Sequence, residues 1–176
     1  TDDASALSKY DYIESLNPIF WARGDDNAND STGYGNHGTF HGDANASSDG
    51  KYSKSFGLDG NGDSIECSDI NIIDESDELT ISVFMYHNSI TTDDAILSKG
   101  FTPLFNGWLL WRDDVTSNSG RTDAYTFSVW DSDDSDTVRI ETAQDSSKLQ
   151  ILTNIIVVLK LNDSNGLRVF INGIED

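Results

Sequence analysis

Short segments in which apolar and polar residues alternate recur along the chain, and clusters of Gly, Asn, Asp and Ser separate them. Alternation with a period of two is typical of half-buried β-strands, and the separating residues favour turns. No window of a dozen residues keeps the spacing of an amphipathic helix, so we predict at most one helical turn, near 70–76. The predicted strands span residues 18–23, 37–42, 53–59, 63–67, 78–87, 95–98, 107–112, 124–130, 136–142, 153–161 and 167–172.

Regularly spaced short strands favour two antiparallel sheets packed face to face, because each strand then buries one of its faces. The segment 124–130 illustrates the alternation: Tyr125, Phe127 and Val129 share one face, and Trp130 lies on the other. The predicted fold is therefore an all-β sandwich with the first three of these side chains in its core. Trp130 is the aromatic residue that such a core explains least.

The length of the chain, 176 residues, is enough for about one domain. We predict that this domain spans 18–176, and that 1–17 form an N-terminal segment in which 9–13 are either a first strand or a linker. The net charge of −20 repels phosphate backbones and anionic lipid headgroups, so nucleic acid is not an expected partner. The longest apolar run, 155–159, is too short to span a bilayer, so membrane insertion is not expected either.

Four segments resemble motifs of one family. Residues 27–39, NANDSTGYGNHGT, resemble the NANDSSGNGNHGT signature of laminin-G-like domains. Further along the chain, FGLDGNGDSI (56–65), ELTISVF (78–84) and LRVFING (167–173) resemble that family's "F-DG-DDYV" hairpin, "FTISAWV" strand and "LRLYVNG" hairpin, in the same order. The resemblance implies a concanavalin A-like two-sheet antiparallel β-sandwich, or jelly roll, from about residue 18 to the end of the sequence.

The last residues predict two hairpin turns, at Asn165–Gly166 and at Asn172–Gly173. Only residues 174–176 remain for the strand that returns from the second turn. In the family that the chain resembles, further strands follow this hairpin. We therefore expect the last strands to lie outside these 176 residues or to be supplied by another chain. Because unpaired sheet edges promote association, self-assembly or strand completion is a further expectation.

The resemblance also implies a calcium site in the loop of residues 25–39. Carried over residue by residue, it points to Asp30 and Asn36, and more weakly to Asp59 and Asp63 in the following hairpin. Hard cations bind six to eight oxygen atoms, which carboxylates, amides and backbone carbonyls supply. The alternative is a loop held only by side chains of Asp and Asn that bond the neighbouring backbone.

Aromatic residues outside the predicted core are candidates for sugar binding, since pyranose rings stack on aromatic faces. The candidates are Trp130, Tyr34, Trp108 and Trp111. Trp108 and Trp111 stand in a segment that is bulky on both faces, so at least one of them is expected in the core.

The sequence gives little support for catalysis. Glucanases of concanavalin A-like architecture carry three acidic residues alternating along one strand. The nearest match here, Glu75, Asp77 and Glu78, has its third acid at the wrong offset and precedes a strand. We therefore expect no enzyme, but a noncatalytic module on a cell or virion surface or outside the cell, which binds glycans or a surface protein with calcium support. The alternative is a structural protein that uses the same sandwich for subunit contacts, as in a virion decoration or fibre.

Overall fold

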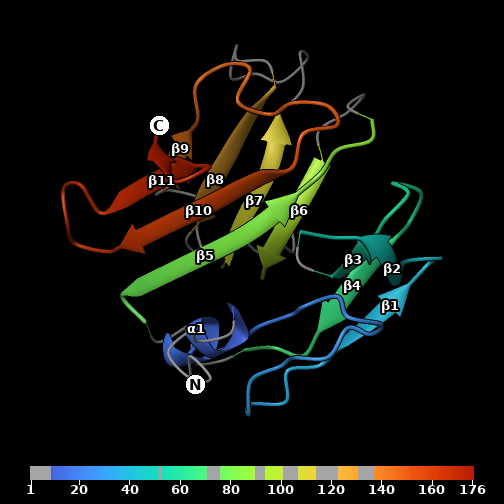
Figure 1. Ribbon diagram of the computed structural model, residues 1–176. Coiled ribbons are helices and arrows are strands. Elements are labelled where there is room, and N and C mark those ends of the chain that lie inside the picture. The colour runs from blue at the N-terminus through green and yellow to red at the C-terminus, as the bar shows by residue number, and fades with distance from the viewer. Residues whose placement is uncertain are drawn as a thin grey trace, which may run out of the picture. The chain divides into compact units, whose positions relative to one another are not determined.

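The computed structural model describes residues 9–51, 53–70, 76–89, 94–100, 107–113, 123–130 and 137–176. The chain divides into two compact units, Thr1–Ile70 and Asn71–Asp176. The strands of both units pair antiparallel (Figure 1). No helix in these ranges is long and apolar enough to cross a membrane.

The first unit contains one short helix and two pairs of strands. Its elements are α1 (Lys9–Ser15), β1 (Gly38–His41), β2 (Asn45–Asp49), β3 (Lys54–Gly57) and β4 (Ser64–Cys67). Strand β1 pairs with β4, and β2 pairs with β3, both antiparallel. The apolar packing is small and includes an edge-to-face contact between Phe40 and Phe56, whose ring centroids are 6.0 Å apart.

The second unit contains two four-stranded antiparallel sheets, which lie one in front of the other in Figure 1. One sheet has the order β12-β11-β10-β5 and the other has the order β6-β7-β8-β9. The strands are β5 (Glu78–Met85), β6 (Asp94–Lys99), β7 (Gly107–Asp113), β8 (Ala124–Trp130), β9 (Thr137–Glu141), β10 (Thr153–Lys160), β11 (Leu167–Ile171) and β12 (Ile174–Glu175).

The core of the second unit lies between its two sheets. Ile155 and Val157 from β10 pack in one cluster with Leu110 from β7 and with Tyr125 and Phe127 from β8. These side chains alternate along their strands with residues on the outer faces, as a period of two requires. The prediction of an all-β sandwich is therefore confirmed, including the face of 124–130 that forms its core.

Three local predictions were wrong. Residues 18–23 form no named strand, because the segment is a loop whose Ala22 makes only an isolated bridge to Asp30. Residues 9–13 lie in helix α1, so the alternative that they form a first strand was wrong. Strand β2 was missed because its sequence, NASSD, has one apolar side chain, Ala46, and thus no alternation to detect. Most of the possible turn at 70–76 lies outside the described residues.

The second predicted hairpin at the end of the sequence is present. Ile171 pairs with Ile174 across a two-residue turn formed by Asn172 and Gly173, which have φ angles of 53° and 83°. Positive φ at both central positions is typical of the turn that matches the twist of two antiparallel strands, and Asn followed by Gly is the favoured pair.

Candidate functional site

The loop of residues 25–39 is organised around the buried carboxylate of Asp30. Its Oδ1 accepts hydrogen bonds from the backbone N–H of Trp21 at 3.1 Å and of Thr32 at 2.9 Å. Its Oδ2 accepts from the Thr32 hydroxyl at 2.7 Å and from the backbone N–H of Asn36 at 3.1 Å. Burial raises the pKa of Asp30, but the bonds from Thr32, Trp21 and Asn36 outweigh burial, so the net pKa is lowered.

Four donors leave Asp30 little capacity to bind a cation, because its oxygens already accept bonds that close the loop. The Asn36 side chain also holds the loop, since its Nδ2 donates to the carbonyl of Ile19 at 3.3 Å. His37 completes this arrangement by accepting a bond at Nδ1 from the backbone N–H of Asp30 at 3.2 Å. The geometry of Asp30 and Asn36 is therefore that of a loop held by local side-chain bonds.

The other two predicted metal residues, Asp59 and Asp63, lie together with a third carboxylate, Asp43. One carboxylate oxygen from each lies within 4.8 Å of the others, and no other group of this kind occurs in the part of the chain that the structure describes. Asp63 accepts the backbone N–H of Asp43 at 2.8 Å and that of Asp59 at 2.9 Å. Asp63 thus fixes both neighbours around itself.

The pairing of β1 with β4 creates this cluster. His41 pairs with Ser64, so the residues that follow β1 meet those that precede β4. Gly42, with φ of 71°, lies so close that a Cβ atom there would collide with the Asp63 carboxylate. The sequence motif shows Asp59 and Asp63 but not Asp43, which is 20 residues from Asp63 and joins it only through this strand register.

Hydrogen bonds and like charges both shift the pKa values within the cluster. The hydrogen bond to Asp63, followed by the charges of Asp63 and Asp59, raises the pKa of Asp43. The pKa of Asp63 is lowered, chiefly by the backbone N–H of Asp59. Three exposed or half-buried carboxylates that repel one another form a donor set suited to a hard cation such as Ca²⁺.

A second candidate site lies on the outer face of the sheet β6-β7-β8-β9. There the rings of Trp111 from β7 and Trp130 from β8 are stacked, with centroids 6.2 Å apart and planes at 18°. The indole N–H of Trp111 donates to Asp113 at 2.7 Å, and the Thr126 hydroxyl donates to the same carboxylate. Because Asp113 is almost fully buried, these bonds fix the orientation of the Trp111 ring.

Charged groups flank the two rings. The guanidinium of Arg139 from β9 lies 5.1 Å from the centroid of Trp111 and contacts Glu141 at 2.5 Å. Ser128 shares the same face of β8 with Trp130, and its hydroxyl is buried with no hydrogen-bond partner among the described residues. The face therefore combines flat apolar surface with donors, acceptors and one unsatisfied hydroxyl.

The other two predicted ligand-binding aromatics lie elsewhere. Trp108 is 9% exposed and packs in the core, with its ring centroid 6.0 Å from that of Phe127. The expectation that at least one of Trp108 and Trp111 belongs to the core thus applies to Trp108. Tyr34 is exposed in a loop of the first unit, whereas Trp111 and Trp130 belong to the second.

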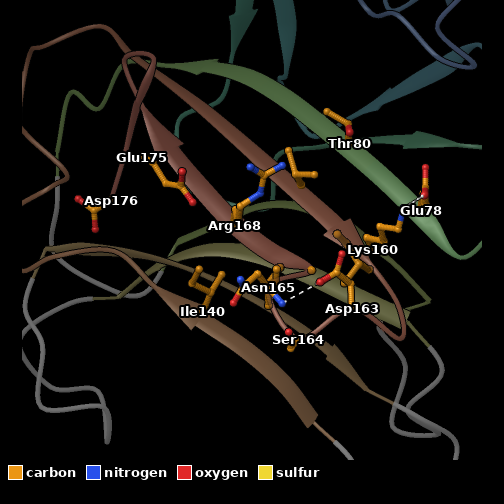
Figure 2. Close-up of a pocket in the computed structure, with 14 residues that line it drawn as sticks. Glu78, Thr80, Ile140, Lys160, Asp163, Ser164, Asn165, Arg168, Glu175 and Asp176 are labelled. Atoms are coloured by element: carbon orange, nitrogen blue, oxygen red, sulfur yellow. Dashed lines mark hydrogen bonds and ion pairs between the residues drawn. The ribbon is translucent and has the colours of Figure 1, made fainter.

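An open groove of about 870 Å³ lies within the second unit. Figure 2 shows side chains from β5, β10 and β11 on one side of it and Ile140 of β9 on the other. Its lining includes the carboxylates of Glu78, Asp163, Glu175 and Asp176 and the cations Lys160 and Arg168. The groove could not be predicted from sequence, because residues from five strands and from the loop between β10 and β11 form it.

A buried ionic cluster at Arg112 was also missed. The Arg112 side chain is 1% exposed and faces inward from β7. It donates to Ser147 at 3.1 Å, to Asp94 at 3.4 Å and to Asp123 at 2.8 Å. The carboxylates that neutralise it point to a structural role, since a buried guanidinium without partners is strongly destabilising.

Comparison with protein-family models, with curated proteins and with solved structures finds no match to this chain. The laminin-G-like resemblance therefore rests on the four sequence motifs alone.

Proposed function

We propose that this protein is a noncatalytic recognition module of laminin-G-like, jelly-roll type that binds carbohydrate, located outside a cell or on a cell or virion surface. The observation that carries the proposal is the stacked pair of Trp111 and Trp130 on an outer sheet face. The C–H face of a pyranose ring packs against indole, and nearby polar groups bond its hydroxyls. Arg139 and Glu141 are such groups in this protein.

The bond from Trp111 to Asp113 supports the proposal for a second reason. A ring that is already fixed loses little rotational freedom when a ligand stacks on it, so more of the contact energy appears as affinity. Asp113 acts here as a positioning residue. The adjacent acids, Asp113 and Glu141, and the net charge of −20 favour an uncharged glycan over a sulfated or uronic one.

The second part of the proposal is calcium binding, by residues that differ in part from those predicted from the sequence. Asp43, Asp59 and Asp63 would hold Ca²⁺, whose charge would relieve the repulsion among the three carboxylates. The ion would stabilise the junction of β1 and β4. Asp30 and Asn36 would act beside it only as loop-forming residues.

A panel of neutral and acidic glycans, screened against the full chain, tests the proposal. With any glycan that binds, we expect Trp130→Ala and Trp111→Ala each to weaken binding about five- to thirtyfold, because stacking on one ring contributes on the order of 1–2 kcal/mol. The matched control is Tyr86→Ala, which removes an exposed aromatic side chain of the second unit outside this face. Unchanged affinity in both folded Trp variants would refute the proposal that these two rings bind carbohydrate.

A structural assembly protein remains the second candidate function. The observation that favours it is the edge strand β9, which pairs only with β8 among the named strands. Sedimentation of the purified chain over a wide concentration range separates the two candidates, because an assembly subunit self-associates and a monovalent recognition module does not.

A further inference from the structure

Strand β9 presents an open edge of the second sheet. The backbone N–H of Thr142 donates to Tyr125 of β8 at 2.9 Å, so the backbone groups of Ile140 and Val138 face β8 as well. Those of Thr137 and Arg139 therefore point away from β8, where the described chain places no strand. Just past β9, the backbone N–H of Ala143 donates to Asp176, which closes the edge at that point.

The groove shown in Figure 2 borders this edge. Ile140 lines it from β9, and Leu167 of β11 lines it from the opposite sheet. Strands β9 and β11 face each other across the two sheets. Val138 shares the inward face of β9 with Ile140 and is nevertheless 45% exposed. A strand added beside β9 would cover Val138 and direct alternate side chains toward Ile140 and Leu167.

The charge of the groove indicates which kind of strand could bind there. Four carboxylates and two cations line the groove, a formal balance of −2. Lys160 is paired with Glu78 at 2.8 Å, so the acids Asp163, Glu175 and Asp176 exceed the remaining cation, Arg168. A second copy of this chain would bring another net charge of −20 to the contact, which opposes self-pairing. A cationic partner is complementary.

We propose that β9 binds an extended peptide segment of a partner protein in which apolar residues alternate with Lys or Arg. The peptide adds a fifth strand to the sheet β6-β7-β8-β9 by bonding the outward backbone groups of Thr137 and Arg139. Its apolar residues enter the groove beside Ile140 and Leu167, and its basic residues meet the surrounding carboxylates. This interaction uses backbone groups of β9, whereas the proposed carbohydrate site uses the rings of Trp111 and Trp130.

The test uses a labelled peptide of about ten residues, alternating Val and Lys, titrated with the full chain by fluorescence anisotropy. We expect saturable binding that weakens as salt rises. N-methylation of the peptide residues whose N–H groups face β9 should weaken binding more than about tenfold, because each methyl group removes a backbone hydrogen bond to β9. The same number of N-methyl groups at the alternate positions should change affinity little.

Protein variants complete the test. Glu175→Lys should weaken binding of the basic peptide, whereas Glu14→Lys, with the same change in net charge on α1, should not. Trp130→Ala should retain peptide binding, so failure of the carbohydrate proposal and failure of this one are distinguishable. The proposal is overturned if an alternating Val and Glu peptide binds equally well, if both N-methylation patterns act alike, or if the peptide competes with a dimer of this chain.

Discussion

The first unit contains two groups of acidic side chains that look alike in sequence and differ in structure. Asp30 is 4% exposed, and four N–H or O–H groups donate to it. Asp43, Asp59 and Asp63 are more exposed and lie close enough to repel one another. The balance of hydrogen-bond donors and negative charges around a carboxylate therefore decides whether it organises a loop or suits a cation. Acidic residues in a glycine-rich loop do not by themselves distinguish the two.

The largest effect is expected from Asp30→Ala. The substitution leaves several loop N–H groups without their acceptor, so we expect the free energy of unfolding to fall by about 3 kcal/mol. Urea denaturation should give the same loss with calcium and with chelator. Asp49→Ala, at an exposed position of β2, is the control and should be nearly silent. A loss of stability seen only with calcium would instead indicate that Asp30 binds the metal ion.

Calcium should have the next largest effect. If the carboxylate cluster binds Ca²⁺, the melting temperature should rise by several degrees at a calcium concentration well above the Kd. Asp43→Asn should remove most of this rise, because it deletes one of the three charges. Differential scanning calorimetry with calcium, magnesium and chelator measures the effect. An equal rise in wild type and Asp43→Asn would contradict the assignment.

The smallest effect concerns pH in the presence of chelator. The pKa of Asp30 is lowered from 3.8, so its stabilising contribution is present above that value and is lost as the pH falls through the lowered pKa. The pKa of Asp43 is raised from 3.8, so its ionised form destabilises the fold at neutral pH, and this disappears as the pH falls through the raised pKa.

Asp43→Asn should therefore be slightly more stable than wild type in chelator at pH 7 and equal to it near pH 3, whereas Asp30→Asn should be less stable at pH 7. Melting temperatures across this pH range check the prediction. If Asp43→Asn is destabilised at pH 7 in chelator, the repulsion inferred for the cluster is absent.

The sandwich of the second unit was largely predictable from sequence because its strands alternate between a shared core and the outer faces. Strand β8 follows this rule, with Tyr125 and Phe127 inside and Trp130 outside. In the first unit, β1 and β4 also alternate, but two other segments do not follow this rule. Residues 18–23 are apolar enough to suggest a strand, yet the segment wraps around Asp30, and the polar sequence of β2 is a strand only by pairing with β3.

The candidate sites were predictable only where their members are close in sequence. Asp59 and Asp63 share one short turn and were found, whereas Asp43 reaches them through the pairing of β1 with β4. Asp113 lies only two residues from Trp111 and was still missed, because spacing alone does not show that the two side chains bond on the outer face of the sheet. Spacing alone could have separated Trp108 from Trp111, since residues three apart on a strand point to opposite faces.

The buried Arg112 side chain has a consequence for how the second unit assembles. Its guanidinium joins Asp94 at the start of β6, Asp123 just before β8, and Ser147 in the segment that precedes β10. Separation of the segment that carries Asp94 or Asp123 would remove one of the two carboxylates that neutralise the buried guanidinium, which is costly in a medium of low polarity. Partial opening is therefore penalised, and backbone amides throughout these strands should exchange with solvent deuterium through one shared, cooperative event.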